Sequence, residues 1–310
     1  MTTVVMTGGS SGFGAIAARR LAGRDSTRLL IGTRAAAADT LALDLGRLDS
    51  VRDFATTVRE SLGDQRIDAL VLNAGVIRPD ADGRTTDGYE TTFAVNHLAH
   101  YLLIRLLLPA LADGARVVLT TSGTYDPATG AGLATPRHAD ADLLAHPDRD
   151  PGRESNPARA GQHAYTASKL CAVSTACALR ELVVARERGI IAIAYDPGQV
   201  FGTGLARELA APLRLAWSVF GTPAGAPLRW FQPTMNTPDA AGTALARLAC
   251  DAAAPGGGAA APVLVALRRG RLTDPELSEL ARRDDLRWRL WNDSARLVGL
   301  DGATADDIGR

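Results

Sequence analysis

Lysine is almost absent from this chain of 310 residues. Of the 34 basic residues only Lys169 is a lysine, and the remaining 33 are arginine. Acidic residues also number 34, so the formal net charge is zero. A balanced charge without a dense basic stripe argues against a nucleic-acid-binding surface. The position of the one lysine therefore needs an explanation from its surroundings.

Cysteine and long apolar runs are also scarce. Cys171, Cys177 and Cys250 make neither a disulfide framework nor a metal-ligand set, and the five histidines follow no metal-ligand spacing. No run of about 18 apolar residues predicts a membrane span. The first residues lack the basic region and apolar core of a signal peptide. We therefore expect a soluble, reduced, cytoplasmic protein without a metal.

Short apolar runs alternate with amphipathic stretches along the whole chain. This pattern is typical of a parallel sheet that is covered by helices on its two faces. It predicts one α/β domain over residues 1–310 with a doubly wound, seven-stranded parallel sheet. The expected strands are 3–7, 28–32, 40–44, 67–72, 116–121, 190–195 and 263–267. The expected helices are 12–22, 48–62, 85–111, 164–188, 238–249 and 275–298.

Three connections have unusual lengths. An insert over about 124–163 is rich in proline, and loops longer than about 12–15 residues are usually functional or disordered. A second long segment, 203–237, holds two of the four tryptophans and two of the six phenylalanines. We interpret it as a substrate lid, with an oligomer contact or a membrane-touching helix as alternatives. The link between strands 28–32 and 40–44 is too short for a helical crossover.

The first expected strand runs into a glycine-rich turn and then an alanine-rich helix. Glycines allow close backbone approach, and a helix N-terminus offers free N–H groups to a pyrophosphate. This context predicts dinucleotide binding, although an ordinary capped turn is the alternative. The expected cofactor-binding residues here are Thr7, Gly8, Ser10, Ser11, Gly12, Phe13 and Gly14.

The second expected strand ends at Arg34. An NAD site usually has an acidic residue near this point, which holds the ribose 2′-hydroxyl. No acidic residue occurs over 27–38, and Arg34 could pair with a 2′-phosphate instead. The sequence thus favours NADP(H), with NAD(H) possible and a solvated arginine as the alternative.

The most specific feature is Tyr165 followed by Lys169. Residues four apart share one face of a helix, so the phenol and the ammonium would lie side by side. A nearby cation favours the phenolate, so we expect a lowered pKa for Tyr165. Such a pair alone could be a surface contact. The use of the only lysine at this position favours an acid–base role.

Taken in this order, the motifs resemble the classical short-chain dehydrogenase/reductase family over about residues 3–300. The resemblance implies a Rossmann-type fold and assigns catalytic roles to Asn96, Ser122, Tyr165 and Lys169. It also implies cofactor contacts that are spread along the chain: Asp44, Leu45, Asn73, Ala74, Gly75, Tyr165, Lys169, Pro197, Gly198, Val200 and Thr203.

The resemblance implies hydride transfer between a nicotinamide and a carbonyl or alcohol carbon. Tyr165 would protonate the alkoxide, Ser122 would donate a hydrogen bond to it, and Lys169 would hold the nicotinamide ribose. Asn96 would anchor a water that links Lys169 to solvent. The leading hypothesis is an NADP(H)-dependent reductase of a ketone or aldehyde on a bulky apolar metabolite. An NAD-preferring secondary-alcohol dehydrogenase and a redox-inactive cofactor sensor or scaffold are the alternatives.

Finer features point to one branch. Thr33-Arg34, the segment 122–127 and the ending 290–297 resemble the retinol dehydrogenase and protochlorophyllide reductase branch. They are more closely similar to bacterial ketoreductases of polyketide pathways, in secondary metabolism. Ser122 and Tyr165 are 43 residues apart instead of about a dozen, and Thr203 lies one residue later than usual. The family's dimer contact would use helices 85–111 and 164–188, but the insert could cap it, so a homodimer stays an open expectation.

Overall fold

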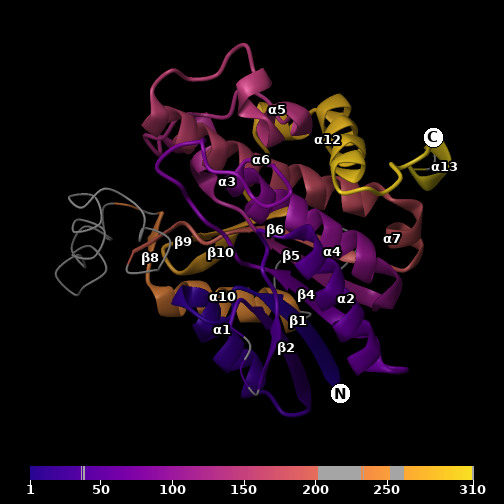
Figure 1. The fold of residues 1–310 in the computed structure, drawn as a ribbon. Coiled ribbons are helices and arrows are strands. Elements are labelled where there is room, and N and C mark those ends of the chain that lie inside the picture. Colours follow the sequence, from indigo (N-terminus) through magenta and orange to yellow (C-terminus); the bar gives the residue numbers. More distant parts are fainter. Residues whose placement is uncertain (36, 38, 202–231, 233, 252–261, 309–310) are drawn as a thin grey trace.

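The computed structural model describes residues 1–35, 37, 39–201, 232, 234–251 and 262–308 (Figure 1). Within them, eight strands form one sheet in the spatial order β10-β9-β6-β5-β4-β1-β2-β3. The predicted parallel strands are β1 (Thr2–Thr7), β2 (Thr27–Thr33), β3 (Thr40–Ala42), β4 (Ile67–Leu72), β5 (Leu111–Thr120), β6 (Ile191–Asp196) and β9 (Leu264–Arg268). Their parallel pairing confirms the doubly wound Rossmann-type sheet.

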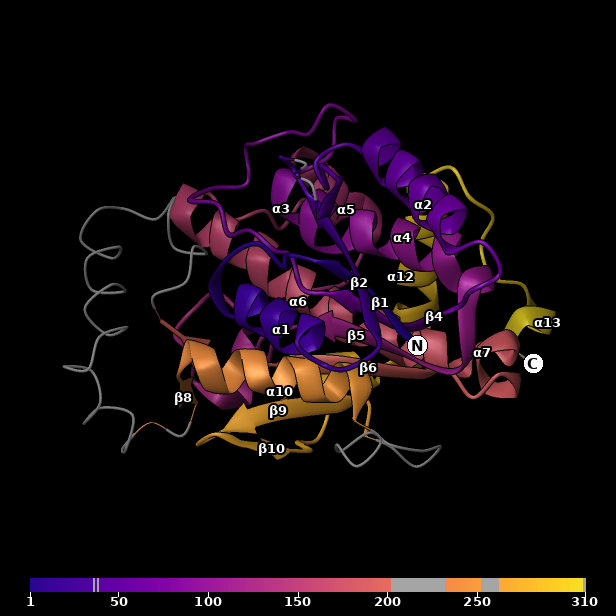
Figure 2. The same cartoon turned by 90° about the horizontal axis from the view of Figure 1, so that it is seen from below.

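The two faces of the sheet are covered by different helices (Figures 1 and 2). On one face, α1 (Gly12–Ala22) and α10 (Pro238–Cys250) pack on Val4, Met6 and Val118. On the other, α2 (Leu48–Leu62), α4 (Ala99–Leu107) and α6 (Pro157–Glu181) cover Val5 and Val117. Successive residues of buried strands point to opposite faces, so the continuous apolar runs follow from burial on two sides.

The sheet has one more strand than predicted. Residues Arg271–Thr273 form β10, which pairs antiparallel with β9 at the sheet edge. Arg269 and Gly270 have φ angles of 50° and 73°, and they form the tight turn between these strands. The arginine-rich run 268–271, whose composition is typical of a solvated loop, therefore forms the hairpin at the sheet edge. The strand could not be predicted because its arginines resemble a loop. Charged residues are tolerated in a strand at a sheet edge.

The predicted helix over 85–111 begins later and is not regular. Its first turn is α3 (Thr91–Phe93), which the buried Glu90 caps by accepting hydrogen bonds from Thr92 N at 2.8 Å and Phe93 N at 2.6 Å. A π-helical segment, η1 (Ala94–Leu98), joins it to α4. Thr91–Ala110 is long and apolar enough to cross a membrane by composition, which the sequence analysis missed. It is a mostly buried core element beside the sheet.

The insert contains more structure than predicted. It holds α5 (Ala141–Ala145), and its last residues already belong to α6. Helix α6 starts at Pro157 instead of 164, because Asn156 accepts a cap hydrogen bond from Arg159 N at 3.1 Å.

Two expected helices are each divided into two. The one over 164–188 forms α6 and α7 (Val183–Glu187), and the one over 275–298 forms α11 (Glu279–Arg282) and α12 (Asp284–Leu297).

The described residues between β2 and β3 hold no helix, as the short connection predicted. Most of the expected lid over 203–237 lies outside the described residues. Its described end forms β8 (Met235–Asn236), which pairs with β7 (Gln199–Val200).

Candidate active site

The chain reverses its direction across the sheet between β1 and β4, and the crevice at the carboxyl ends of such strands is the usual ligand site. The β1–α1 turn opens there. Gly8 has a φ of 68°, and a Cβ added to it would lie 2.6 Å from Ala74 N. A Cβ on Gly14 would lie 2.0 Å from Gly8 O. Glycine is therefore required at these two positions, since the turn packs directly against the segment after β4.

The N-terminus of α1 is available to an anion. Ser11 occupies the N-cap position without a side-chain cap hydrogen bond, and the first turn contains no acidic residue. Ser10 and Ser11 are exposed, and Gly12 and Phe13 are half-buried. The first N–H groups of a helix have no partner within it, and the dipole favours negative charge. The chemistry of these residues suits a pyrophosphate, and their role in cofactor binding is a proposal.

Side-chain hydrogen bonds fix this turn to the neighbouring strands. Asn73 donates from Nδ2 to Gly8 O at 3.0 Å and accepts from Thr120 Oγ1 at 3.0 Å. Thr7 is fully buried, and its Oγ1 accepts from Asn73 N and Ala74 N at 3.1 and 3.2 Å. Thr7 and Asn73 therefore support the cofactor turn from within the protein.

Residues predicted to contact the adenosine end follow β2 and β3. Arg34 is exposed at the end of β2, where its guanidinium is accessible to a ligand. Asp44 is half-buried and accepts a hydrogen bond from Gly46 N at 3.0 Å, while Leu45 is buried. The three residues follow strands that are neighbours in the sheet.

The predicted catalytic side chains converge at the end of β5. Ser122 lies two residues after the end of β5, and its side chain hydrogen-bonds the Tyr165 phenol. The Lys169 ammonium lies 5.6 Å from the Tyr165 ring centroid and donates a hydrogen bond to Thr120 O at 3.1 Å. Tyr165 and Lys169 are 6% and 5% exposed. The insert thus does not separate Ser122 from Tyr165, despite their distance in sequence.

The expected lowering of the Tyr165 pKa is wrong in this structure. Burial raises the pKa of the phenol to about 12, Asp196 adds to the rise, and the hydrogen bond with Ser122 opposes it. Burial also lowers the pKa of Lys169 to about 8, which Asp196 opposes. The ammonium lies over the ring, and the removal of water from the two groups outweighs their attraction.

Asn96 lies in the π-helical segment η1, beside Lys169. Its Oδ1 accepts from Val76 N at 2.8 Å, and its Nδ2 donates to Val76 O at 2.9 Å and Ser168 Oγ at 3.0 Å. A Cβ on Gly75 would lie 3.3 Å from Asn96 Oδ1 and 3.4 Å from Lys169 Nζ. The absence of a side chain at Gly75 therefore lets the amide and the ammonium approach the same point.

The loop after β6 supplies the remaining predicted contacts. Pro197 O accepts a hydrogen bond from Asn236 Nδ2 at 3.0 Å, and Gly198, with a φ of 71°, packs against Thr234 O. Val200 is buried in β7. Thr203, predicted here as a cofactor contact, lies outside the described residues.

Two groups near the site have no role assigned from the sequence. The Asp196 carboxylate is paired with Arg268 at 2.6 Å, although the two residues are 72 positions apart. His100 is buried, and its Nε2 lies 3.0 Å from Thr7 Oγ1. Asp196 adjoins the motif residues Pro197 and Gly198, which was the available signal. No local pattern indicated the partner of either group.

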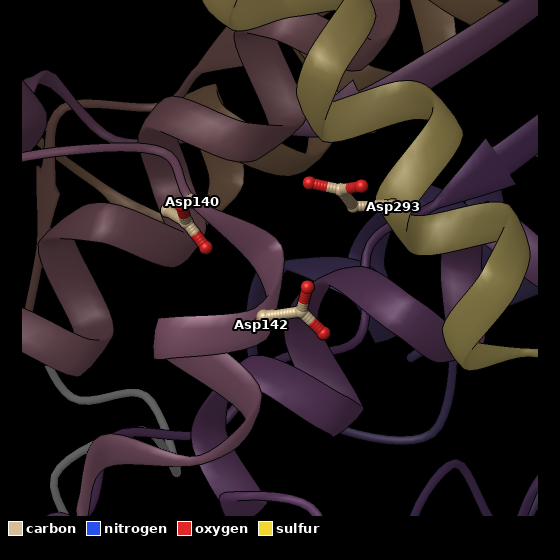
Figure 3. Close-up of side chains that lie close together, drawn as sticks. All are labelled: Asp140, Asp142 and Asp293. Carbon is tan, nitrogen blue, oxygen red and sulfur yellow. The ribbon is translucent and has the colours of Figure 1, made fainter. Parts of the chain in front are cut away.

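Other chemistry-bearing residues have structural partners. Asp140, Asp142 and Asp293 lie close together between α5 and α12 (Figure 3). Arg289 pairs with Asp140 at 3.1 Å, and Arg296 pairs with Asp142 and Asp293, so arginines offset the negative charge. Cys171 and Cys177 are buried in the core, and burial raises the pKa of their thiols.

Comparisons with known proteins bear on the family and the fold of the chain. A family model for short chain dehydrogenases matches residues 2–130. Protochlorophyllide reductase A, chloroplastic, of Oryza sativa subsp. japonica is 34% identical over 244 residues, which are 70% of this chain and 62% of that protein. Protochlorophyllide reductase of Avena sativa is 32% identical over 231 residues, 66% of this chain and 73% of that protein. The chain spans 62% and 59% of the first two relatives, those of Oryza sativa and Hordeum vulgare.

Solved structures show the same fold. An uncharacterized protein from Mycobacterium paratuberculosis has a TM-score of 0.65 at 26% identity, covering 98% of this chain and 96% of that one. A short chain dehydrogenase from Burkholderia cenocepacia J2315, in complex with NADP, has a TM-score of 0.58 at 22% identity, covering 87% and 97%. From its sheet, its site and its relatives, the chain belongs to the short-chain dehydrogenase/reductase family, on the side of the protochlorophyllide reductases.

Proposed function

We propose that this chain is an NADP(H)-dependent reductase that transfers a hydride to a ketone or aldehyde of a bulky, mostly apolar metabolite. The observation that carries this proposal is the convergence of Ser122, Tyr165 and Lys169 at the end of β5. Membership of an oxidoreductase family and relatives named as reductases support the same chemistry.

The β1–α1 turn supports dinucleotide binding. The uncapped N-terminus of α1 would hold the pyrophosphate through its free N–H groups. The exposed Arg34 would pair with a 2′-phosphate, which favours NADP(H), while NAD(H) lacks that group. Asp44 and Leu45 would contact adenine, and Lys169 would hold the nicotinamide ribose.

When bound, the cofactor supplies the hydride, and the protein positions and polarises the carbonyl. The Tyr165 phenol, whose pKa burial raises to about 12, donates its proton to the forming alkoxide. Ser122 donates a hydrogen bond to the same oxygen and thereby holds it near the phenol. The buried ammonium of Lys169 places positive charge beside the phenolate that remains, and Asn96 would orient a water toward Lys169 for proton return.

The substrate class rests on composition. The aromatic-rich segment 203–237, interpreted as a lid, suits a bulky apolar ligand, because apolar side chains line most small-molecule sites. A role in secondary metabolism and a cytoplasmic location remain proposals from the sequence.

The proposal is tested by an NADPH-oxidation screen with the purified chain over aromatic polyketide ketones, retinoids, steroids and small aldehydes. The same screen with NADH and with Tyr165→Phe provides the controls. We expect NADPH-dependent turnover of at least one bulky ketone or aldehyde, and none with the Phe variant. Binding of NADPH without turnover of any carbonyl compound would favour the sensor hypothesis.

A further inference from the structure

A buried ion pair lies beside the proposed catalytic residues, on two neighbouring strands. Asp196 ends β6 and Arg268 ends β9, and their Oδ2 and Nη2 atoms are 2.6 Å apart. The Asp196 Oδ1 accepts a second hydrogen bond from Gly198 N at 2.9 Å. The side chain of Asp196 is 3% exposed, whereas that of Arg268 is 22% exposed. The carboxylate is therefore fixed in position by two donors.

The register of the sheet places this carboxylate next to the catalytic serine. Thr120 pairs with Tyr195, and Thr121 N donates to Tyr195 O at 2.8 Å, so Asp196 lies beside the end of β5. A Cβ on Gly123 would lie 2.9 Å from Asp196 Oδ2. The carboxylate thus packs against the backbone directly after Ser122.

Little water separates the Asp196 carboxylate from Tyr165 and Lys169, so its negative charge acts on these two groups. Its partner Arg268 reaches partly into water, while the carboxylate faces the protein interior, where charges interact more strongly. Asp196 raises the pKa of Lys169 and of Tyr165. The carboxylate attracts the ammonium, which favours protonated Lys169, and it repels a phenolate, which favours protonated Tyr165. Both effects raise a pKa.

We infer that Asp196, fixed by Arg268 and Gly198 N, is a positioning residue that keeps the Lys169 ammonium and the Tyr165 phenol protonated in the working pH range. For turnover this inference rests on the proposed function, but its electrostatic part concerns the cofactor-free chain.

Other titratable groups face the carboxylate or the Lys169 ammonium. His100 of α4 interacts with Lys169, and burial lowers the pKa of His100 to about 3, so it is neutral near pH 8. Tyr195 precedes Asp196 on β6, and Tyr125 and Asp126 lie at η3 (Gly123–Tyr125), where Cys177 of α6 also acts on Tyr125. Burial raises the pKa of Tyr125, Tyr195 and Cys177, so these groups are neutral near pH 8. Asp126 is half-buried, and the Asp196→Asn substitution leaves this residue in place.

The single lysine makes the test direct. With ¹³C-labelled lysine, the cofactor-free protein gives one lysine side-chain NMR signal, whose pH titration reports Lys169 alone. We expect a midpoint near 8 in the wild type. In the isosteric Asp196→Asn variant the midpoint should fall, by roughly one pH unit. An unchanged or higher midpoint in a folded Asp196→Asn protein would overturn the inference.

A second variant separates electrostatics from folding. Arg268→Met removes the cation that offsets Asp196, so the Lys169 midpoint should lie at or above the wild-type value. A fall in Arg268→Met would mean that the ion pair acts only through packing, and would also overturn the inference. Circular dichroism checks that each variant folds. If Asp196→Asn does not fold, the Lys169 midpoint in Arg268→Met tests the inference.

Turnover gives an independent result. In wild-type protein that reduces a carbonyl compound, the alkaline limb of kcat/KM should move to lower pH in Asp196→Asn. An unmoved limb in an active variant contradicts the inference alone. A wild type without turnover contradicts the proposed function, and the lysine titration still decides the electrostatic part.

Discussion

The Lys169 ammonium lies 5.6 Å from the centroid of the Tyr165 ring, and the two side chains are buried on consecutive turns of α6. Burial moves their pKa values toward each other, the phenol upward to about 12 and the ammonium downward to about 8. In the cofactor-free chain the phenol is therefore protonated at neutral pH, which is the state that a proton donor requires.

Lys169→Met should stabilise the protein while it impairs turnover. Burial lowers the Lys169 pKa from 10.5 to about 8, which corresponds to a cost of up to about 3 kcal/mol. Below pH 8 the lysine is charged in the folded and unfolded states, and the cost is fully present. Between pH 8 and 10.5 the unfolded state binds more protons, so the wild type recovers stability as pH rises.

Urea unfolding at pH 7 and pH 10 checks this prediction. We expect a larger free energy of unfolding for Lys169→Met at pH 7 and a smaller difference at pH 10. The lost hydrogen bond to Thr120 O makes the gain less than the upper value. A Met variant that is less stable than the wild type at pH 7 would show that burial of the Lys169 ammonium does not destabilise the fold.

Gly8→Ala should abolish cofactor binding and destabilise the fold. A Cβ at Gly8 would lie 2.6 Å from Ala74 N, in a left-handed backbone conformation. Gly130→Ala is the matched control, because Gly130 has a φ of 60° and open space around it. The control should lose only about 1–2 kcal/mol of stability and keep NADPH affinity. Equal losses of stability and NADPH affinity in the two variants would show that contact with Ala74 is not what requires glycine at position 8.

Arg34→Asp should reverse the cofactor preference. The new carboxylate would repel a 2′-phosphate and accept a hydrogen bond from a 2′-hydroxyl. We expect NADPH affinity to fall roughly 10- to 100-fold, as the loss of a charged hydrogen bond predicts. Fluorescence titration with NADPH and NADH measures the change, and Arg59→Asp on α2 is the exposed control. Unchanged NADPH affinity would show that Arg34 does not contact the 2′-phosphate.

The chain should be a monomer in solution. In α12, Ser294 Oγ hydrogen-bonds His97 at 2.8 Å, Trp291 packs edge-on against Tyr101, and Arg287 pairs with Glu181 of α6. Helix α12 therefore packs against α4 and α6, in the two regions that the family would use for a dimer. Sedimentation should give a mass near 32.4 kDa. A dimer at micromolar concentration would show that another surface associates.

Much of the fold was predictable because the buried strands are continuous apolar runs and the helices are amphipathic. The edge strand β10 was not, since an edge tolerates arginines that resemble a loop. The start of α3 depends on the buried cap Glu90, and the start of α6 on the cap Asn156, which outweighed the apolar pattern.

The candidate site was predictable where motifs are local in sequence. Thr7, Gly8 and Gly14 lie in or beside the β1–α1 turn, and Ser122, Tyr165 and Lys169 lie near the end of β5; their roles are proposals. The sign of the Tyr165 pKa shift was not predictable, because it depends on how deeply the phenol is buried. The pairing of Asp196 with Arg268 joins two strands across the sheet, and no sequence spacing indicates it.

The central claim is that the Tyr165 phenol transfers the proton in carbonyl reduction. The most direct measurement compares steady-state turnover and NADPH affinity of wild type and Tyr165→Phe with a ketone from the substrate screen. The account predicts a loss of at least about 10²-fold in kcat with NADPH affinity nearly unchanged. A Phe variant that turns over at close to the wild-type rate would contradict it.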